Sequence, residues 1–143
     1  MPSFTTQIPN LRYVGPICRV KIGLSLPATE ELKAQGKDIP LSCEVTALID
    51  TGASGTAINS EVVQNLSLIS RGITQIATPS TKAHPCNVYD ISLLFPNKVT
   101  ISLLQAVEAP LEGQNIQCLI GRDVLSKGIL IYNGYTNTFS LSF

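Results

Sequence analysis

The most informative part of this sequence is the octapeptide Ala47-Leu48-Ile49-Asp50-Thr51-Gly52-Ala53-Ser54. It continues the apolar run 45–49, whose composition is that of a strand buried on both faces. Asp50 ends this run and is followed by a Thr-Gly pair that permits a tight turn. Because an unpaired buried carboxylate is costly, an acid in this place indicates a function. We interpret the octapeptide as half of an active site.

A second stretch has the same character, since the apolar residues 118–120 run into Gly121, Arg122 and a helix-compatible segment that ends at Leu125. The two stretches, in this order, resemble the single-lobe, retroviral-type aspartic proteases, the retropepsin-like family. The resemblance is closest over residues 44–60 and 116–132. It implies an all-β, single-lobe acid-protease fold, a closed β-barrel with one or two short helices, formed by residues 1–143 as a single domain.

The pattern in the rest of the chain also predicts short strands separated by turn residues. We expect strands at 14–22, 73–78, 86–95 and 99–103, and two more within 128–143. In the last pair, local chemistry favours a turn at Asn133-Gly134, whereas the resemblance implies a turn at 135–137. Either choice places Phe139, Leu141 and Phe143 on one face of the final strand.

Two segments favour helices. Residues 27–38 are polar and helix-favouring for at most two turns, closed by Gly36, and we expect an exposed insertion between hairpin strands. Residues 60–66 predict a short helix capped by Ser60, with Val62, Val63 and Leu66 on one side.

Length and composition limit the functional classes. With 143 residues, the chain is too short for the two-lobed, pepsin-like form of the fold. A hydrophobic content of 44% with 14% charged residues indicates a folded, core-forming chain. A net charge of zero suggests neither nucleic acid nor a membrane surface as a partner. The N-terminus has no signal-peptide pattern, and we expect a soluble, cytoplasmic protein.

The sequence suggests neither a metal nor a cofactor. The four cysteines, at 18, 43, 86 and 118, are irregularly spaced, which suits reduced core thiols better than disulfides or a zinc site. His84 is the single histidine, has no second pair of ligands at metal-binding spacing, and is expected in a solvated loop.

Peptide hydrolysis needs an activated water and a polarised carbonyl group. Two close carboxyl groups that share one proton can supply both, one as base and the other as acid. Asp50 and the Asp50 of a second copy fit this requirement, because the chain has a single Asp-Thr-Gly. Gly52 would let the backbone turn closely beside the carboxylate. We therefore predict Asp50, Thr51 and Gly52 as the catalytic loop.

The resemblance adds further roles. It implies that the Thr51 hydroxyls of two chains hydrogen-bond to each other and that Ala53 borders the substrate cleft. It places a flap at the expected hairpin tip 79–85, where we predict Thr81 and Lys82 as substrate-binding residues. The resemblance implies that the arginine at position 122 pairs with an acid shortly after Ala53. Here Ser54 and Gly55 follow, and Asp123 is the substitute partner that the sequence offers.

The predicted function is an aspartic endopeptidase that acts as a homodimer on a peptide or protein substrate. The resemblance implies that terminal strands of both copies share a sheet, with Phe139, Leu141 and Phe143 as its apolar face. An alternative is a non-catalytic, retropepsin-like peptide-binding or dimerisation module, although the intact Asp-Thr-Gly argues against it. A further alternative is a processing enzyme released from a polyprotein, although Met1 and the turn-rich start favour a free-standing product.

Overall fold

The computed structural model describes residues 1–78 and 81–143, with side chains for all of these except residues 76–78, 81–84 and 104. The elements, in chain order, are β1 (Ser3–Gln7), α1 (Leu11–Val14), β2 (Ile17–Leu24), α2 (Leu26–Ala34), β3 (Cys43–Ile49), β4 (Ala57–Ile58), α3 (Ser60–Asn65), β5 (Gly72–Thr78), β6 (Thr81–Leu94), β7 (Thr100–Glu108), β8 (Cys118–Ile120), α4 (Arg122–Leu125), β9 (Ile129–Asn133) and β10 (Thr138–Ser142).

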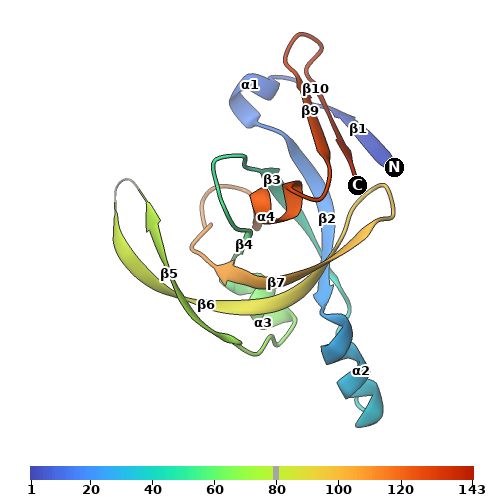
Figure 1. The fold of residues 1–143 in the computed structure, drawn as a ribbon, viewed down its shortest axis with the longest axis vertical. Helices are drawn as coiled ribbons and strands as arrows, with labels where there is room; N and C mark the ends of the chain where they lie inside the picture. The colour runs from blue at the N-terminus through green and yellow to red at the C-terminus, as the bar shows by residue number, and fades with distance from the viewer. Residues whose placement is uncertain (79–80) are drawn as a thin grey trace.

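A closed β-barrel forms the body of the molecule (Figure 1). Its strands follow the order β2-β3-β8-β4-β7-β6, and pairing of β2 with β6 closes the ring, while β5 extends the sheet beyond β6. Alternating apolar residues point inward; in β6 these are Tyr89, Ile91 and Leu93, as the sequence pattern predicts. The predicted fold class is confirmed, with four short helices in the described residues instead of one or two.

Strand β3 carries the chain toward Asp50. Val45, Ala47 and Ile49 are buried in the barrel, whereas Thr46 and Leu48 on the other face are only half-buried. The prediction that both faces of this strand are buried is therefore wrong, because part of its outer face is uncovered. The pairing with β8 is parallel, so both strands leave the sheet at the same end.

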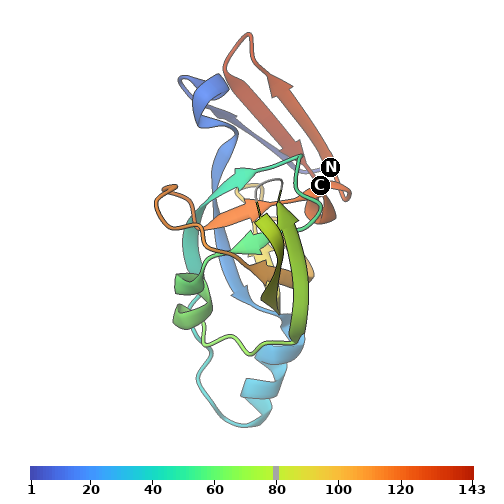
Figure 2. The same cartoon turned by 90° about the vertical axis from the view of Figure 1, so that its left-hand side faces the viewer.

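The two ends of the chain form a second, three-stranded sheet in the order β1-β10-β9 (Figures 1 and 2). Phe4, Phe95, Phe139 and Phe143 form one aromatic cluster, with ring centroids 4.8–6.5 Å apart in the contacting pairs. Phe139 and Leu141 are fully buried inside a single chain. The face that carries them therefore packs against the core of its own chain, and the expected sheet shared by the terminal strands of two copies stays a prediction.

The insertion between β2 and β3 is confirmed as an exposed helix, α2, which projects from one end of the barrel (Figure 1). Ser25 caps it by accepting a hydrogen bond from the Ala28 N–H, and none of its residues is buried. Its nine residues slightly exceed the predicted two turns, and Gly36 follows with φ +67°, as expected of a helix-ending glycine.

The predicted cap of α3 is wrong by one residue. Asn59, and not Ser60, caps this helix, because its side-chain oxygen accepts a hydrogen bond from the Val62 N–H at 3.1 Å. The Asn59 N–H donates to the Gln117 carbonyl at 3.1 Å, which fixes the chain at the start of the helix.

Two hairpin connections bear on the sequence predictions. Strand β6 already begins at Thr81, so most of the predicted tip 79–85, with His84 and Pro85, is strand and not loop. The part of that prediction that concerns Pro79 and Ser80 lies outside the described residues. In the C-terminal hairpin, Asn133 still pairs with Thr138. The loop is therefore 134–137, which excludes a two-residue turn at Asn133-Gly134 and favours the position that the resemblance implies.

The aromatic cluster predicts the effect of Phe139→Ala. Removing a fully buried ring should lower the free energy of unfolding by about 3–5 kcal/mol. Urea denaturation at several protein concentrations measures this, with Tyr135→Ala, at a side chain that is 98% exposed, as the control. If Phe139 instead faced a second copy, the loss would appear as weaker dimerisation and an unchanged stability of the monomer.

Candidate active site

Asp50 stands where β3 leaves the barrel. Its N–H donates to the carbonyl of Ile120 at 2.9 Å, which continues the pairing of β3 with β8 by one residue. Its carbonyl accepts from the Ala53 N–H at 3.2 Å, which closes a tight turn over Thr51 and Gly52. The residue is half-buried, so its carboxylate is held by the fold and remains within reach of solvent.

Gly52 orients that carboxylate. Its N–H donates to Oδ1 of Asp50 at 2.9 Å. A Cβ at position 52 would lie 3.1 Å from the same oxygen, a distance that only few Cβ contacts show. Glycine therefore allows the backbone to approach one carboxylate oxygen closely, and the other oxygen has no hydrogen bond within the part of the chain that the structure describes.

The segment after β8 braces this loop. The N–H of Arg122 donates to the Ala53 carbonyl at 2.9 Å, and the N–H of Asp123 donates to the Ser54 carbonyl at 3.1 Å. Gly121 is needed for this contact, because a Cβ there would overlap the carbonyl group of Gly55. The two stretches that stand out in the sequence thus lie against each other.

Thr56 and Asp123 lock the two segments together. The fully buried Thr56 donates from its hydroxyl to Oδ1 of Asp123 at 2.8 Å and from its N–H to Oδ2 at 3.0 Å. The same hydroxyl accepts from the Gly121 N–H at 3.1 Å. Sequence reasoning missed Thr56; a threonine among small residues just before a buried strand was the available signal.

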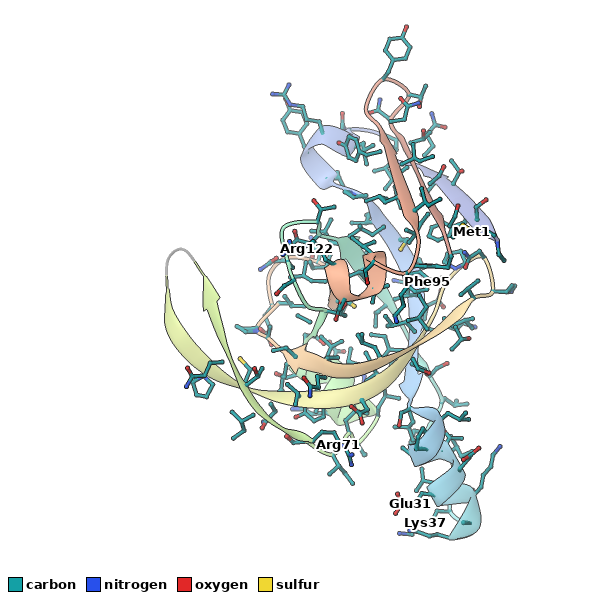
Figure 3. The ribbon with its side chains drawn as sticks, in the orientation of Figure 1. Met1, Glu31, Lys37, Arg71, Phe95 and Arg122 are labelled. Carbon is teal, nitrogen blue, oxygen red and sulfur yellow. The ribbon has the colours of Figure 1, made fainter. Side chains whose placement is uncertain are left out.

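Arg122 holds the loop in a different way from the expected one. Its Nη1 donates to the carbonyl of Thr51 at 2.7 Å. Figure 3 labels Arg122 on the ribbon with its side chains. The suggestion that Asp123 pairs with it is wrong, since Asp123 is engaged by Thr56 and the Val124 N–H, and no ion pair of Arg122 occurs among the described residues. The guanidinium therefore fixes the backbone beside Asp50 and leaves its carboxylate untouched.

The other predicted site residues are Thr51 and Ala53 on the loop and Thr81 and Lys82 in β6. Thr51 is exposed, and its hydroxyl has no partner within the described part of the chain. Ala53 is half-buried on the same loop. Thr81 and Lys82 begin β6, and their side chains lie outside the description. The structure thus brings residues 50–53 together with 120–123.

The cysteines lie apart from this loop. No disulfide joins them, and burial raises the pKa of the Cys18 thiol to about 12 and also raises that of Cys118. These two thiols are therefore inert, protonated core groups. Among residues 1–78 and 81–143, no group of His, Cys, Asp or Glu side chains is arranged to hold a metal ion. Nor does any helix in the described residues have the length and apolarity needed to cross a membrane.

Comparisons with known proteins agree with this geometry. The family model described as aspartyl protease matches residues 34–124, which is more than half of the chain and includes Asp50, Gly121 and Arg122. The fold is similar to that of a retropepsin-like aspartic protease from Rickettsia conorii, with a TM-score of 0.59 and 11% identity, over 97% of this chain and 89% of the other. At that identity the likeness concerns the fold alone. No match is found among curated proteins.

The network at Thr56 predicts the effect of Thr56→Val, a change of nearly constant size. It removes the hydroxyl that serves both Asp123 and Gly121, and should lower the free energy of unfolding by about 1–3 kcal/mol. Thr100→Val, at an exposed position in β7, is the matched control. Equal stability of the two variants by urea denaturation would show that the network does not brace the loop.

Proposed function

We propose that this chain, which belongs to the aspartyl protease family, is an aspartic endopeptidase that acts as a homodimer, with one Asp50 from each copy. The observation that carries the proposal is that a single-lobe fold presents a single, half-buried carboxylate on a braced loop. The reaction needs two carboxyl groups with different protonation, so a second copy must supply the other. In this proposal the 143 residues form one domain of each copy.

In the proposed dimer, the two Asp50 carboxyl groups share one proton. The ionised group takes a proton from a water molecule, whose oxygen attacks the carbonyl carbon of the substrate. The protonated group gives its proton to the carbonyl oxygen, and a tetrahedral intermediate forms. When the C–N bond breaks, the protonated carboxyl group gives its proton to the leaving nitrogen. The ionised carboxylate takes a proton from a hydroxyl group of the intermediate, so the pair again shares one proton.

The residues around Asp50 support these roles of the two carboxyl groups as base and acid. The Gly52 N–H holds Oδ1 at 2.9 Å, which leaves the other oxygen to meet water and the partner copy. The fixed orientation matters because a misplacement of about 1 Å can cost roughly a hundredfold in rate. Arg122 and the Thr56 network hold the backbone of the loop 50–53 in place on its side toward β8.

Thr51 is the residue that best fits contact with the second copy. It is exposed at the tip of the loop, and its hydroxyl lacks an intrachain partner among the described residues. Two such hydroxyls related by a twofold axis can donate and accept in turn. We expect a dimer whose population rises with protein concentration.

In the same proposal, the cleft holds an extended peptide between Ala53 and the β5–β6 hairpin. This hairpin reaches beyond the barrel, with Gly72 paired to Val88 and Thr78 paired to Thr81 (Figure 1). A hairpin of this kind can close over a substrate and exclude water. Thr81 and Lys82, at the start of β6, are the residues that we propose for contact with the peptide backbone.

The proposal predicts that Asp50→Asn abolishes cleavage. The amide cannot take a proton from water, while it can still accept the hydrogen bond from Gly52. The readout is a peptide-library digest at several pH values, with sedimentation and thermal unfolding to show that dimer and fold persist. Asp38→Asn, at an exposed acid on the insertion, is the control. Undiminished cleavage by Asp50→Asn would refute the assignment.

If the native chain cuts no peptide and retains a bound partner in a pull-down, it is a binding module instead.

A further inference from the structure

A cleft of about 700 Å³ lies between α2 and the segment that connects α3 to β5. None of the residues that line it belongs to the catalytic loop 50–53, so it is separate from the proposed active site. Its volume falls within the range of about 300–1,000 Å³ that is usual for ligand sites. A single small ion would leave most of it empty, whereas a few peptide residues would fill it.

The walls of this cleft are mainly aliphatic. Leu24 and Leu66 form its inner part, Pro27 and Leu32 of α2 form one side, and Leu68 and Ile69 form the other. The Ile69 side chain is 83% exposed, which is unusual for an isoleucine beside a concave surface. An apolar ligand would bind here favourably, because it removes the surfaces of these side chains from water.

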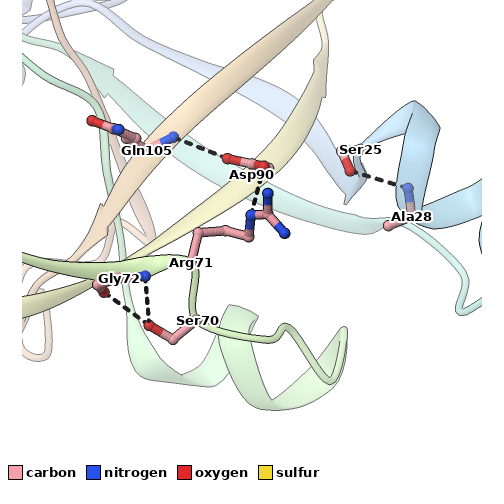
Figure 4. Close-up of polar contacts among 7 residues, drawn as sticks. All are labelled: Ser25, Ala28, Ser70, Arg71, Gly72, Asp90 and Gln105. Atoms are coloured by element: carbon pink, nitrogen blue, oxygen red, sulfur yellow. Dashed lines mark hydrogen bonds and ion pairs between the residues drawn. The ribbon is translucent and has the colours of Figure 1, made fainter.

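One cation is held in position at the cleft. Arg71 donates from Nε to Oδ2 of Asp90 at 3.3 Å. The other oxygen of Asp90 accepts from the Gln105 N–H at 3.3 Å, so the acid is fixed from both sides. Figure 4 shows that the guanidinium of Arg71 lies between β6 and α2, with its end turned toward the α2 side.

The two Nη atoms of Arg71 make no hydrogen bond or ion pair within the described residues, and 67% of the side chain is exposed. They present paired N–H groups in the planar geometry that suits a carboxylate. The other charges of the cleft are placed less well for this. Glu31 accepts only a long hydrogen bond from Gln35, at 3.5 Å, on an exposed part of α2. Lys37 and Asp38 are neighbours of opposite charge beyond the helix.

We propose that this cleft is a second peptide site, which binds the free carboxyl terminus of a peptide whose last residues are apolar. The terminal carboxylate pairs with the Nη atoms of Arg71, and the preceding side chains lie against Leu68, Ile69 and the α2 wall. Asp90 contributes by fixing the guanidinium before the ligand arrives, which reduces the entropic cost of binding. The proposal does not depend on catalysis, because it requires nothing of Asp50.

The test is a binding experiment with the tetrapeptide acetyl-Gly-Leu-Val-Leu in two forms, the free acid and the C-terminal amide. The protein is the full chain carrying Asp50→Asn, so that the peptide is not cut. Amide NMR shifts of the isotope-labelled protein report affinity and position together. We expect saturable binding of the free acid, with shifts confined to residues 24–40 and 66–71 and to Asp90. Binding of the amide should be about tenfold weaker.

Three variants separate the contributions. Arg71→Gln should weaken the free acid by about tenfold and leave the amide unchanged. Arg19→Gln is the matched control, because Arg19 also pairs with a carboxylate, that of Glu44 at 3.6 Å, and lies outside the cleft. The Arg19→Gln variant should bind both forms of the peptide as tightly as the parent protein does. Ile69→Ser, at an exposed position, should weaken both forms of the peptide without a change in thermal stability.

Several outcomes would overturn the proposal. These are the absence of saturable binding, equal affinity for acid and amide, or an Arg71→Gln variant that binds like the parent. Shifts centred on residues 50–53 would place the peptide in the proposed active site instead. Competition by decanoate with an affinity equal to that of the peptide would show that the cleft takes apolar carboxylates in general and not peptide ends.

Discussion

The parallel pairing of β3 with β8 is the constraint on which the candidate site depends. It makes two apolar strands end side by side, so that Asp50 and Gly121 leave the sheet together. The glycine at 121 permits contact with the backbone of Gly55, and Thr56 then bridges to Asp123 with its hydroxyl and its N–H. The carboxylate is therefore positioned by strand register and by hydrogen bonds within one chain.

Much of the architecture could be predicted, because the hydrophobic period is visible in the sequence. The alternation in 86–95 predicts a half-buried strand, and the structure agrees. The details that failed depend on tertiary contacts. Sequence reasoning could not tell Ser60 from Asn59 as a cap, since both residue types cap helices and the contact of Asn59 with Gln117 made the choice. It also could not show that Phe139 packs inside its own chain.

In the candidate site, too, the residues with a local sequence signal could be predicted, and those that depend on distant contacts could not. Asp50 and Gly52 stand out because an acid and a glycine follow an apolar strand, a signal that is local in sequence. For the fully buried Thr56 the local signal is weaker, a threonine among small residues, because its role depends on a residue that is 67 positions away. The α2 insertion shows a further limit: its polar surface reads as a solvated helix, yet one side of it lines a cleft whose other side comes from residues 66–71.

The central claim, that each active unit needs one Asp50 from each of two copies, is tested most directly by subunit mixing. Native chain and the Asp50→Asn variant are mixed in varying proportions, left to exchange subunits, and assayed for cleavage at constant total protein. If both carboxyl groups are needed, activity follows the square of the native fraction, and an equal mixture keeps about one quarter of it. Retention of about one half, with a linear dependence throughout, would mean that a single Asp50 suffices and would contradict the account.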